Sequence, residues 1–213
     1  MSRALRNFLL LISTGSKLVS FNRKILTLPI ARSSRSYVLK SSLGFDPIDK
    51  QLKVLCTTKT YEDYQTKVEH HVLTLGSGRR LKWRKVKCAL QRFDEIHRRD
   101  WICINGVLYY LIVVSSDEHY QEEFPDIVCF NVRSEKFSYV KKDMELATAR
   151  GNLDSALANY KGKLAKLEAD VCLDTGIITS IKMWVLQDAE KHQWSGYLCL
   201  RLASSLEDNS WMP

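Results

Sequence analysis

Two adjacent histidines are the most obvious candidates for metal binding or acid–base chemistry in this chain. His70 and His71 lie in the alternating stretch KVEHHVLTL, a pattern that favours a β-strand. Adjacent side chains on a strand point to opposite faces of a sheet, so the two imidazoles are not expected to share one metal ion. His97, His119 and His192 are scattered through polar segments. We therefore interpret all the histidines as structural or surface residues.

The cysteines are the next candidates, as nucleophiles or as metal ligands. They are Cys56, Cys88, Cys103, Cys129, Cys172 and Cys199. None belongs to a CxxC pair, although a metal site needs ligands that converge on one ion. Disulfide frameworks are typical of short secreted chains. Because most of these cysteines lie in apolar runs, the pattern favours buried thiols in a reducing compartment.

Two loops resemble binding motifs superficially. The segment GSGRR at 76–80 lacks the GK[ST] ending and the strand-to-helix context of a phosphate loop, and we interpret it as a hairpin turn. The segment DEHYQEEFPD at 117–126 lacks the alternating acidic positions and central glycine of a calcium loop. A GxSxG nucleophile elbow is also missing from the sequence. We therefore predict that the protein is not an enzyme, and we assign no catalytic, cofactor-binding or metal-binding residue.

The positive charge of the chain is concentrated at one end. The formal net charge is +8, and the region before residue 46 contains eight basic side chains and no acidic one. The remaining sequence is balanced, with 24 basic and 24 acidic residues. Nucleic-acid-binding domains usually gather positive charge on a folded face. We therefore expect no nucleic-acid partner, and the apolar run at 8–12 is too short to span a membrane.

The N-terminal segment supports two interpretations. Residues 1–17 contain arginine and serine but no acid, as organelle transit peptides do. The same composition suits a simple N-terminal extension. Both alternatives remain open, and we set the predicted boundary between an extension at 1–17 and a folded domain at 18–213.

Turn residues between apolar runs predict a series of β-hairpins. Asp46-Pro47 suits a type I turn, and Asn105-Gly106 suits a type I′ turn between two strands. Further hairpins are expected around GSGRR, around the polar turn RSEK after Phe130, and around QDAEK after Leu186. Phe45 and Phe130 occupy matching positions in two of these hairpins. Their spacing corresponds to about two repeats of 40–45 residues, the length of a propeller blade. The predicted fold class is all-β. Its tryptophans are expected to be core anchors: Trp83, Trp101, Trp184, Trp194 and Trp211.

One region departs from the β pattern. Apolar residues at 146, 153, 157, 160, 164, 167 and 171 follow helical spacing, although Gly151 and Gly162 interrupt it. On periodicity alone, this spacing predicts a helix over 146–171.

Seven segments in order carry a family resemblance. They are LTLP at 26–29, LGFDPIDKQLKVLC at 43–56, HHVLTLGSGRRLKWRKV at 70–86, ICINGVLYYL at 102–111, IVCFNVRSEKFSYV at 127–140, NYKGKLAKL at 159–167 and MWVLQDAEKHQWS at 183–195. Together they resemble the plant F-box-associated domain of the type 3 β-propeller variety, over about residues 18–200. The resemblance implies an array of propeller-like blades, with strands from about residue 156 and at most a short helix near 142–150.

The resemblance also implies a function. Members of that family are substrate-recognition subunits of SCF-type ubiquitin ligases, in which the F-box binds the adaptor and the associated domain holds the target. Residues 1–17 cannot contain an F-box, and residues 18–213 supply about four to five blades. We therefore expect an incomplete array, an unidentified target protein as partner, and only indirect contact with SCF components. The expected location is the cytoplasm or nucleus, with mitochondrial or plastid import as the alternative. The substrate-binding residues stay unassigned.

Overall fold

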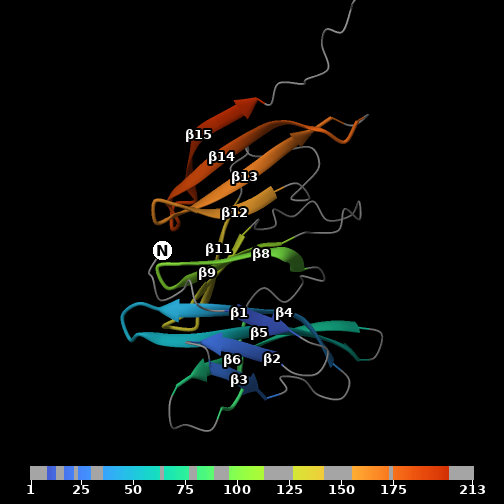
Figure 1. Cartoon of the computed structure of the whole chain (residues 1–213), viewed down its shortest axis with the longest axis vertical. Helices are drawn as coiled ribbons and strands as arrows, with labels where there is room; N and C mark the ends of the chain where they lie inside the picture. The colour runs from blue at the N-terminus through green and yellow to red at the C-terminus, as the bar shows by residue number, and fades with distance from the viewer. Residues whose placement is uncertain are drawn as a thin grey trace, which may run out of the picture. The chain divides into compact units, whose positions relative to one another are not determined.

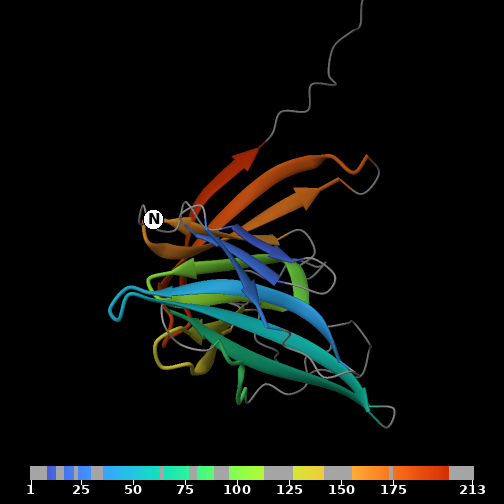
Figure 2. The same ribbon diagram turned by 60° about the horizontal axis from the view of Figure 1, so that its bottom comes forward.

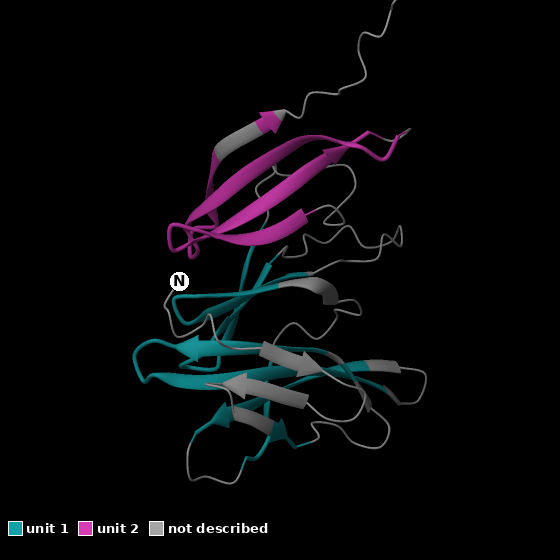
Figure 3. Ribbon diagram, viewed as in Figure 1, with its two compact units in different colours: residues 1–142 teal, residues 143–213 magenta. Residues whose placement is uncertain are grey.

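The computed structural model describes residues 9–12, 17–21, 24–29, 36–62, 65–76, 81–88, 96–112, 127–141, 155–172 and 175–201. All the secondary-structure elements within these ranges are β-strands (Figure 1). The strands form three four-stranded sheets and one three-stranded sheet, all antiparallel. The chain divides into two compact units, residues 1–142 and 143–213 (Figure 3). The all-β prediction is confirmed, and the short helix expected near 142–150 lies outside the described residues.

The first unit contains three sheets. The three-stranded sheet consists of β1 (Leu9–Ile12), β2 (Lys17–Phe21) and β3 (Lys24–Leu28). The second sheet consists of β4 (Ser36–Asp46), β5 (Gln51–Glu62), β6 (Gln65–Leu75) and β7 (Arg84–Val86). The third consists of β8 (Ile96–Ile104), β9 (Val107–Ile112), β10 (Ile127–Asn131) and β11 (Phe137–Val140). Strand β1 falls within the predicted extension at 1–17, and the boundary at residue 18 stays a prediction.

The second unit contains a single described sheet of β12 (Ser155–Tyr160), β13 (Lys163–Val171), β14 (Ile178–Asp188) and β15 (Gln193–Arg201). In each four-stranded sheet the strands lie side by side in chain order. Such sheets, each an antiparallel meander, are the blades from which β-propellers are built. The long strands β4, β5 and β6 show the twist expected of such a sheet (Figure 2).

The β4–β7 sheet is buried on both faces. On one face, Leu55 and Val72 join a core with residues of the β8–β11 sheet, namely Leu108, Phe130 and Val132. On the other face, Val54 and Leu73 pack with Leu28 at the end of β3. Because neighbouring positions of β5 face different cores, its central run VLC is continuously apolar instead of alternating.

The predicted hairpins are present in the structure. Asn105 and Gly106 have φ values of 48° and 83°, as a type I′ turn between β8 and β9 requires. The chain also reverses between β4 and β5, β6 and β7, β10 and β11, and β14 and β15, as predicted. A second two-residue turn joins β12 to β13, where Lys161 and Gly162 have φ values of 50° and 83°.

The helix predicted from periodicity is wrong over the described residues 155–171, which form β12, a turn and β13. On a strand, a step of four residues stays on the same face and a step of three moves to the other, so this spacing places apolar side chains on both faces. Both faces of β13 are buried, as Leu164 at 3% exposure and Ala165 at 0% show. The period of two is therefore absent from the sequence, and the steps of three and four only resemble a helix. The strands expected from about residue 156 are confirmed.

Candidate functional site

Three hairpin turns of the first unit meet and form one surface. They are the β4–β5 turn (47–50), the β8–β9 turn (105–106) and the β10–β11 turn (132–136), and we call them the three-turn surface. The backbone N–H of Val132 donates to the carbonyl of Gly106 at 2.8 Å. The Arg133 Nε lies 3.3 Å from the Asp49 Oδ2. A Cβ added to Gly106 would stand 3.0 Å from the Cδ of Pro47, so the three turns are in mutual contact.

Two of these turns share one design. The side chain of Asp46 accepts a hydrogen bond from the N–H of Ile48 at 2.9 Å. Asn131 accepts in the same way from the N–H of Arg133 at 3.1 Å. Four residues after each of these side chains, the backbone turns to positive φ, 51° at Lys50 and 58° at Glu135. A hydrogen bond from an Asx side chain to the backbone two residues later stabilises a tight turn.

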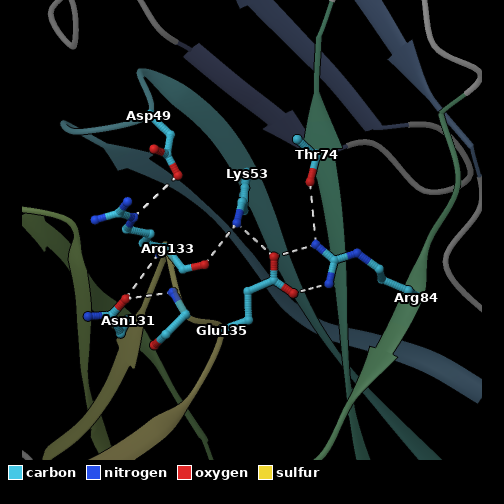
Figure 4. A network of polar contacts seen from close by, with 8 residues as sticks. Asp49, Lys53, Thr74, Arg84, Asn131, Arg133 and Glu135 are labelled. Carbon is cyan, nitrogen blue, oxygen red and sulfur yellow. Dashed lines mark hydrogen bonds and ion pairs between the residues drawn. The ribbon is translucent and has the colours of Figure 1, made fainter.

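A partly buried ionic network fixes the β10–β11 turn against the β4–β7 sheet (Figure 4). The Glu135 carboxylate pairs with the Lys53 Nζ at 2.7 Å and with the Arg84 guanidinium. Their exposed side-chain fractions are 13% for Glu135, 8% for Lys53 and 51% for Arg84. Lys53 also donates to the carbonyl of Arg133 at 3.4 Å. Burial, followed by the charge of Arg84, lowers the pKa of Lys53.

The network gives the three-turn surface a fixed geometry. Lys53 belongs to β5 and Arg84 to β7, whereas Glu135 belongs to the turn of another sheet. The turn therefore cannot move relative to β5 without exposing a buried charge to solvent or leaving it without its ion-pair partner. Close packing strengthens this constraint, because a Cβ added to Gly44 on β4 would stand only 2.6 Å from the Cγ2 of Val132.

The outer face of the three-turn surface combines one large apolar side chain with charge. Ile48 is 65% exposed at the tip of the β4–β5 turn. The positively charged side chains of the turns and of their supporting network are Lys50, Lys53, Arg84, Arg133 and Lys136. The negatively charged ones are Asp46, Asp49 and Glu135. This composition suits binding to another protein, because it provides an apolar contact within a charged rim.

The two adjacent histidines make separate contacts. His70 is 6% exposed, its Nδ1 lies 3.1 Å from the Thr57 Oγ1, and its ring lies 4.8 Å from that of Phe137. Burial, followed by the charge of His71, lowers the pKa of His70 to about 4, so the ring is neutral near pH 7. His71 makes different contacts, to the Thr58 Oγ1 at 3.3 Å and to Glu69 at 3.6 Å.

The cysteines have the surroundings of core residues. Cys56 and Cys129 are buried thiols, as predicted, and Cys88, Cys103 and Cys172 are partly buried. Burial raises the pKa of Cys129 to about 12 and also raises that of Cys103. Because the thiolate is the reactive form, these two thiols are poor nucleophiles at neutral pH. The side chain of Cys199 lies outside the described residues.

Three of the tryptophans anchor the sheets, as predicted. Trp83 packs beside Leu28 and donates from its Nε1 to the Pro29 carbonyl at 2.8 Å. Trp101 stacks on Tyr110 with ring centroids 4.2 Å apart. Trp184 covers Gly196, where an added Cβ would stand 3.0 Å from the ring. Trp194 is partly buried, and Trp211 lies outside the described residues.

The two loops considered as binding motifs lie mostly outside the described residues. Only Gly76 of GSGRR is described, and DEHYQEEFPD at 117–126 is not. Across the part of the chain that the structure describes, no cluster of three or more His, Cys, Asp or Glu side chains could hold a metal ion. In that same part, no helix is long and apolar enough to cross a membrane.

Four-stranded antiparallel meanders that follow one another along the chain are the arrangement expected of a propeller-type domain. Comparison with known proteins identifies the family. The profile of the F-box associated beta propeller domain matches residues 18–210, and the chain therefore belongs to that family. The resemblance found in the sequence motifs is confirmed.

The similar curated proteins come from Arabidopsis thaliana. F-box protein At3g61340 is 43% identical over 171 residues, which cover 74% of this chain and 40% of that protein. Putative F-box protein At3g23960 is 39% identical over 180 residues, covering 82% of this chain and 42% of that protein. F-box only protein 12 is 40% identical over 161 residues, covering 74% and 36% respectively. The chain thus matches about two-fifths of the length of these relatives.

The three-turn surface was not predicted from the sequence. The polar segment RSEK was predicted only as a turn, and Arg84 only as part of a strand. The available signal was the match of the two hairpins, which places Asp46 on Asn131 and Lys50 on Glu135. That match predicts two turns of one design, but it does not predict that they touch.

Proposed function

We propose that this domain recognises a target protein for an SCF-type ubiquitin ligase, and that it acts by binding and not by catalysis. The observation that carries the proposal is the family match over residues 18–210, together with relatives that are F-box proteins. The site chemistry supports it. The buried His70 is neutral, and the thiols of Cys103 and Cys129 have raised pKa values, so none of these groups is prepared for acid–base or nucleophilic work at neutral pH.

In this proposal the domain contacts the target, and the adaptor of the ligase is contacted by an F-box. An F-box is helical, whereas the described part of residues 18–210 consists of strands and turns. The domain alone is therefore expected to form no stoichiometric complex with the purified adaptor. A tight complex of this kind in size-exclusion chromatography would overturn this division of roles.

The experiment that tests the function is chemical crosslinking and mass spectrometry with the 213-residue chain as bait in plant-cell extract. The control is the same chain after denaturation by heat. The proposal predicts reproducible crosslinks from the native chain to one or a few proteins whose abundance rises when the proteasome is inhibited. Crosslinks that are the same for the native and the denatured chain would contradict it.

We further propose that the protein acts in the cytoplasm or nucleus. Import into mitochondria or plastids is the alternative suggested by the acid-free N-terminus. In the structure, β1 (Leu9–Ile12) pairs with β2 in a three-stranded sheet, so cleavage of a leader near residue 17 would remove a paired strand. A fluorescent protein fused to the C-terminus decides the question: signal in the cytosol and nucleus supports the proposal, and signal in organelles overturns it.

A further inference from the structure

We propose that the three-turn surface is the recognition face of the domain, and that its partner is an acidic protein segment carrying an apolar side chain that packs on Ile48. This inference rests on the proposed function and adds a site and a ligand chemistry to it. Three observations carry it: the exposure of Ile48, the positive charge around it, and the rigid support beneath it.

The exposure of Ile48 is not required by the fold. The hairpins at Asp46, Asn131 and Asp188 have the same design, with an Asx side chain that caps the turn and positive φ four residues later. The second residue after the Asx is Ile48 in the first hairpin, Arg133 in the second and Glu190 in the third. The turn thus accepts charged side chains at this position.

An isoleucine that is 65% exposed therefore costs hydration free energy without serving the turn. Isolated exposed apolar residues are common, but this one lies where three turns meet and where the surroundings are charged. An apolar side chain in such a place is what a protein interface uses at its centre, with polar groups at its rim.

The charge around Ile48 selects the partner. Lys50, Arg133 and Lys136 are exposed on the turns, and Arg84 adds a half-exposed guanidinium beside them. Asp49 is already paired with Arg133, and Glu135 is paired with Lys53 and Arg84. The five basic and three acidic side chains of the turns and their support still leave a net charge of +2, so an acidic segment meets a complementary potential there.

The support beneath the turns favours binding. Glu135 and Lys53 are nearly buried and join two sheets, and Val132 donates a hydrogen bond to the neighbouring turn at 2.8 Å. A surface that is already ordered loses little conformational entropy when a partner binds.

The test begins with a display library of short random peptides selected on the whole purified chain, followed by fluorescence anisotropy of the enriched peptides. Enrichment of acidic peptides with at least one large apolar residue is expected. Two variants test the site: Ile48→Glu, which places in this turn the residue type found in the third hairpin, and the double variant Lys50→Glu/Lys136→Glu. Each is expected to weaken binding by about tenfold or more. The loss from the charge reversal should shrink as salt is added.

Matched controls come from the second unit. Ile177 is 49% exposed and Lys191 is 78% exposed at its side chain, so Ile177→Glu repeats the first change elsewhere and Lys191→Glu repeats one of the two charge reversals. Both controls should bind as the unaltered chain does. Circular dichroism melts of all four variants confirm that folding is unchanged.

Enriched peptides without acidic bias, or binding that survives both surface variants, would overturn the inference. If the peptides bind but respond only to changes elsewhere, the recognition face is wrong while the proposed function stands. If the library yields no binder and native-specific crosslinks are also absent, both fall.

Discussion

Replacing Glu135 by glutamine should destabilise the first unit, because it removes the charge that compensates a buried lysine. The carboxylate pairs with Lys53 at 2.7 Å, and the two side chains are only 13% and 8% exposed. In Glu135→Gln the Lys53 ammonium keeps neutral acceptors, the new amide oxygen and the carbonyl of Arg133 at 3.4 Å. A cation without its ion-pair partner then remains in a site already poor in water, and the charges of Asp46 and Asp49 offset the loss only in part.

The size of the effect follows from the burial of the two partners. Breaking a fully buried ion pair by removing one partner costs about 3–5 kcal/mol. Loss of the ion pair with Arg84, whose side chain is 51% exposed, adds at most about 1 kcal/mol to this cost. Because the network lies near the surface, water can partly hydrate Lys53 after the change. We therefore expect a loss of about 2–3 kcal/mol, which corresponds to a melting temperature lower by roughly 4–12 °C.

Glu69→Gln is the matched control. Glu69 also pairs with two lysines, Lys85 at 2.6 Å and Lys67 at 3.4 Å, but these lysine side chains are 55% and 60% exposed. Its removal should cost less than about 1 kcal/mol. The assay is thermal and urea unfolding of the whole chain, followed by circular dichroism and tryptophan fluorescence.

Equal losses for Glu135→Gln and Glu69→Gln would refute the reasoning, since burial would then not govern the cost. A second variant sharpens the test. Lys53→Met added to Glu135→Gln removes the buried charge that has lost its partner and should restore at least about 1 kcal/mol of the free energy of unfolding. Additivity of the two changes would show that the pair is not coupled.

Three further predictions concern the core. The pKa of His70 is lowered to about 4 in the folded state, so on acidification the imidazole is protonated in the unfolded chain before it is protonated in the folded one. The contribution of neutral His70 to the free energy of unfolding should therefore be present above about pH 6.5 and fall by about 2–3 kcal/mol towards pH 4.5. Urea titrations should show a weaker fall in His70→Gln, and an unchanged pH profile would contradict the assignment. Gly44→Ala places a Cβ 2.6 Å from Val132 and should lower the free energy of unfolding by about 1–3 kcal/mol, whereas Gly76→Ala, with nothing within 4 Å, should change it by less than about 0.5 kcal/mol. Because burial raises the pKa of Cys129 to about 12, iodoacetamide at mildly alkaline pH should label it only after unfolding, and rapid labelling of the native chain in peptide mass spectra would count against this environment.

The hairpins could be predicted because their turns are encoded locally. Asn105-Gly106 specifies positive φ at both positions, and the structure has it. The same local chemistry acts at Lys161-Gly162, but the apolar spacing around that turn resembled a helix. Both faces of β13 are buried, so the alternation that identifies a strand was missing, and only the family resemblance led to the correct assignment.

The site could not be predicted for a different reason. The Lys53–Glu135 pair joins residues 82 positions apart, and Glu135 lies in a segment that the sequence presents as an ordinary polar turn. Which turns meet depends on how whole sheets pack, here through the core shared by Leu55, Leu108 and Val132. Local sequence patterns contain no information about that packing. They do show that the two Asx turns repeat one another.

We propose that the domain presents a target protein to a ubiquitin ligase through the three-turn surface. The direct measurement is ubiquitin transfer in a reconstituted SCF ligase, with this chain joined behind the F-box of a relative and with its native-specific crosslinked protein as substrate. The account predicts transfer with the unaltered chain, about tenfold less with Ile48→Glu, and full transfer with Ile177→Glu. Transfer that is equal with all three chains, or absent with the unaltered one, would contradict it.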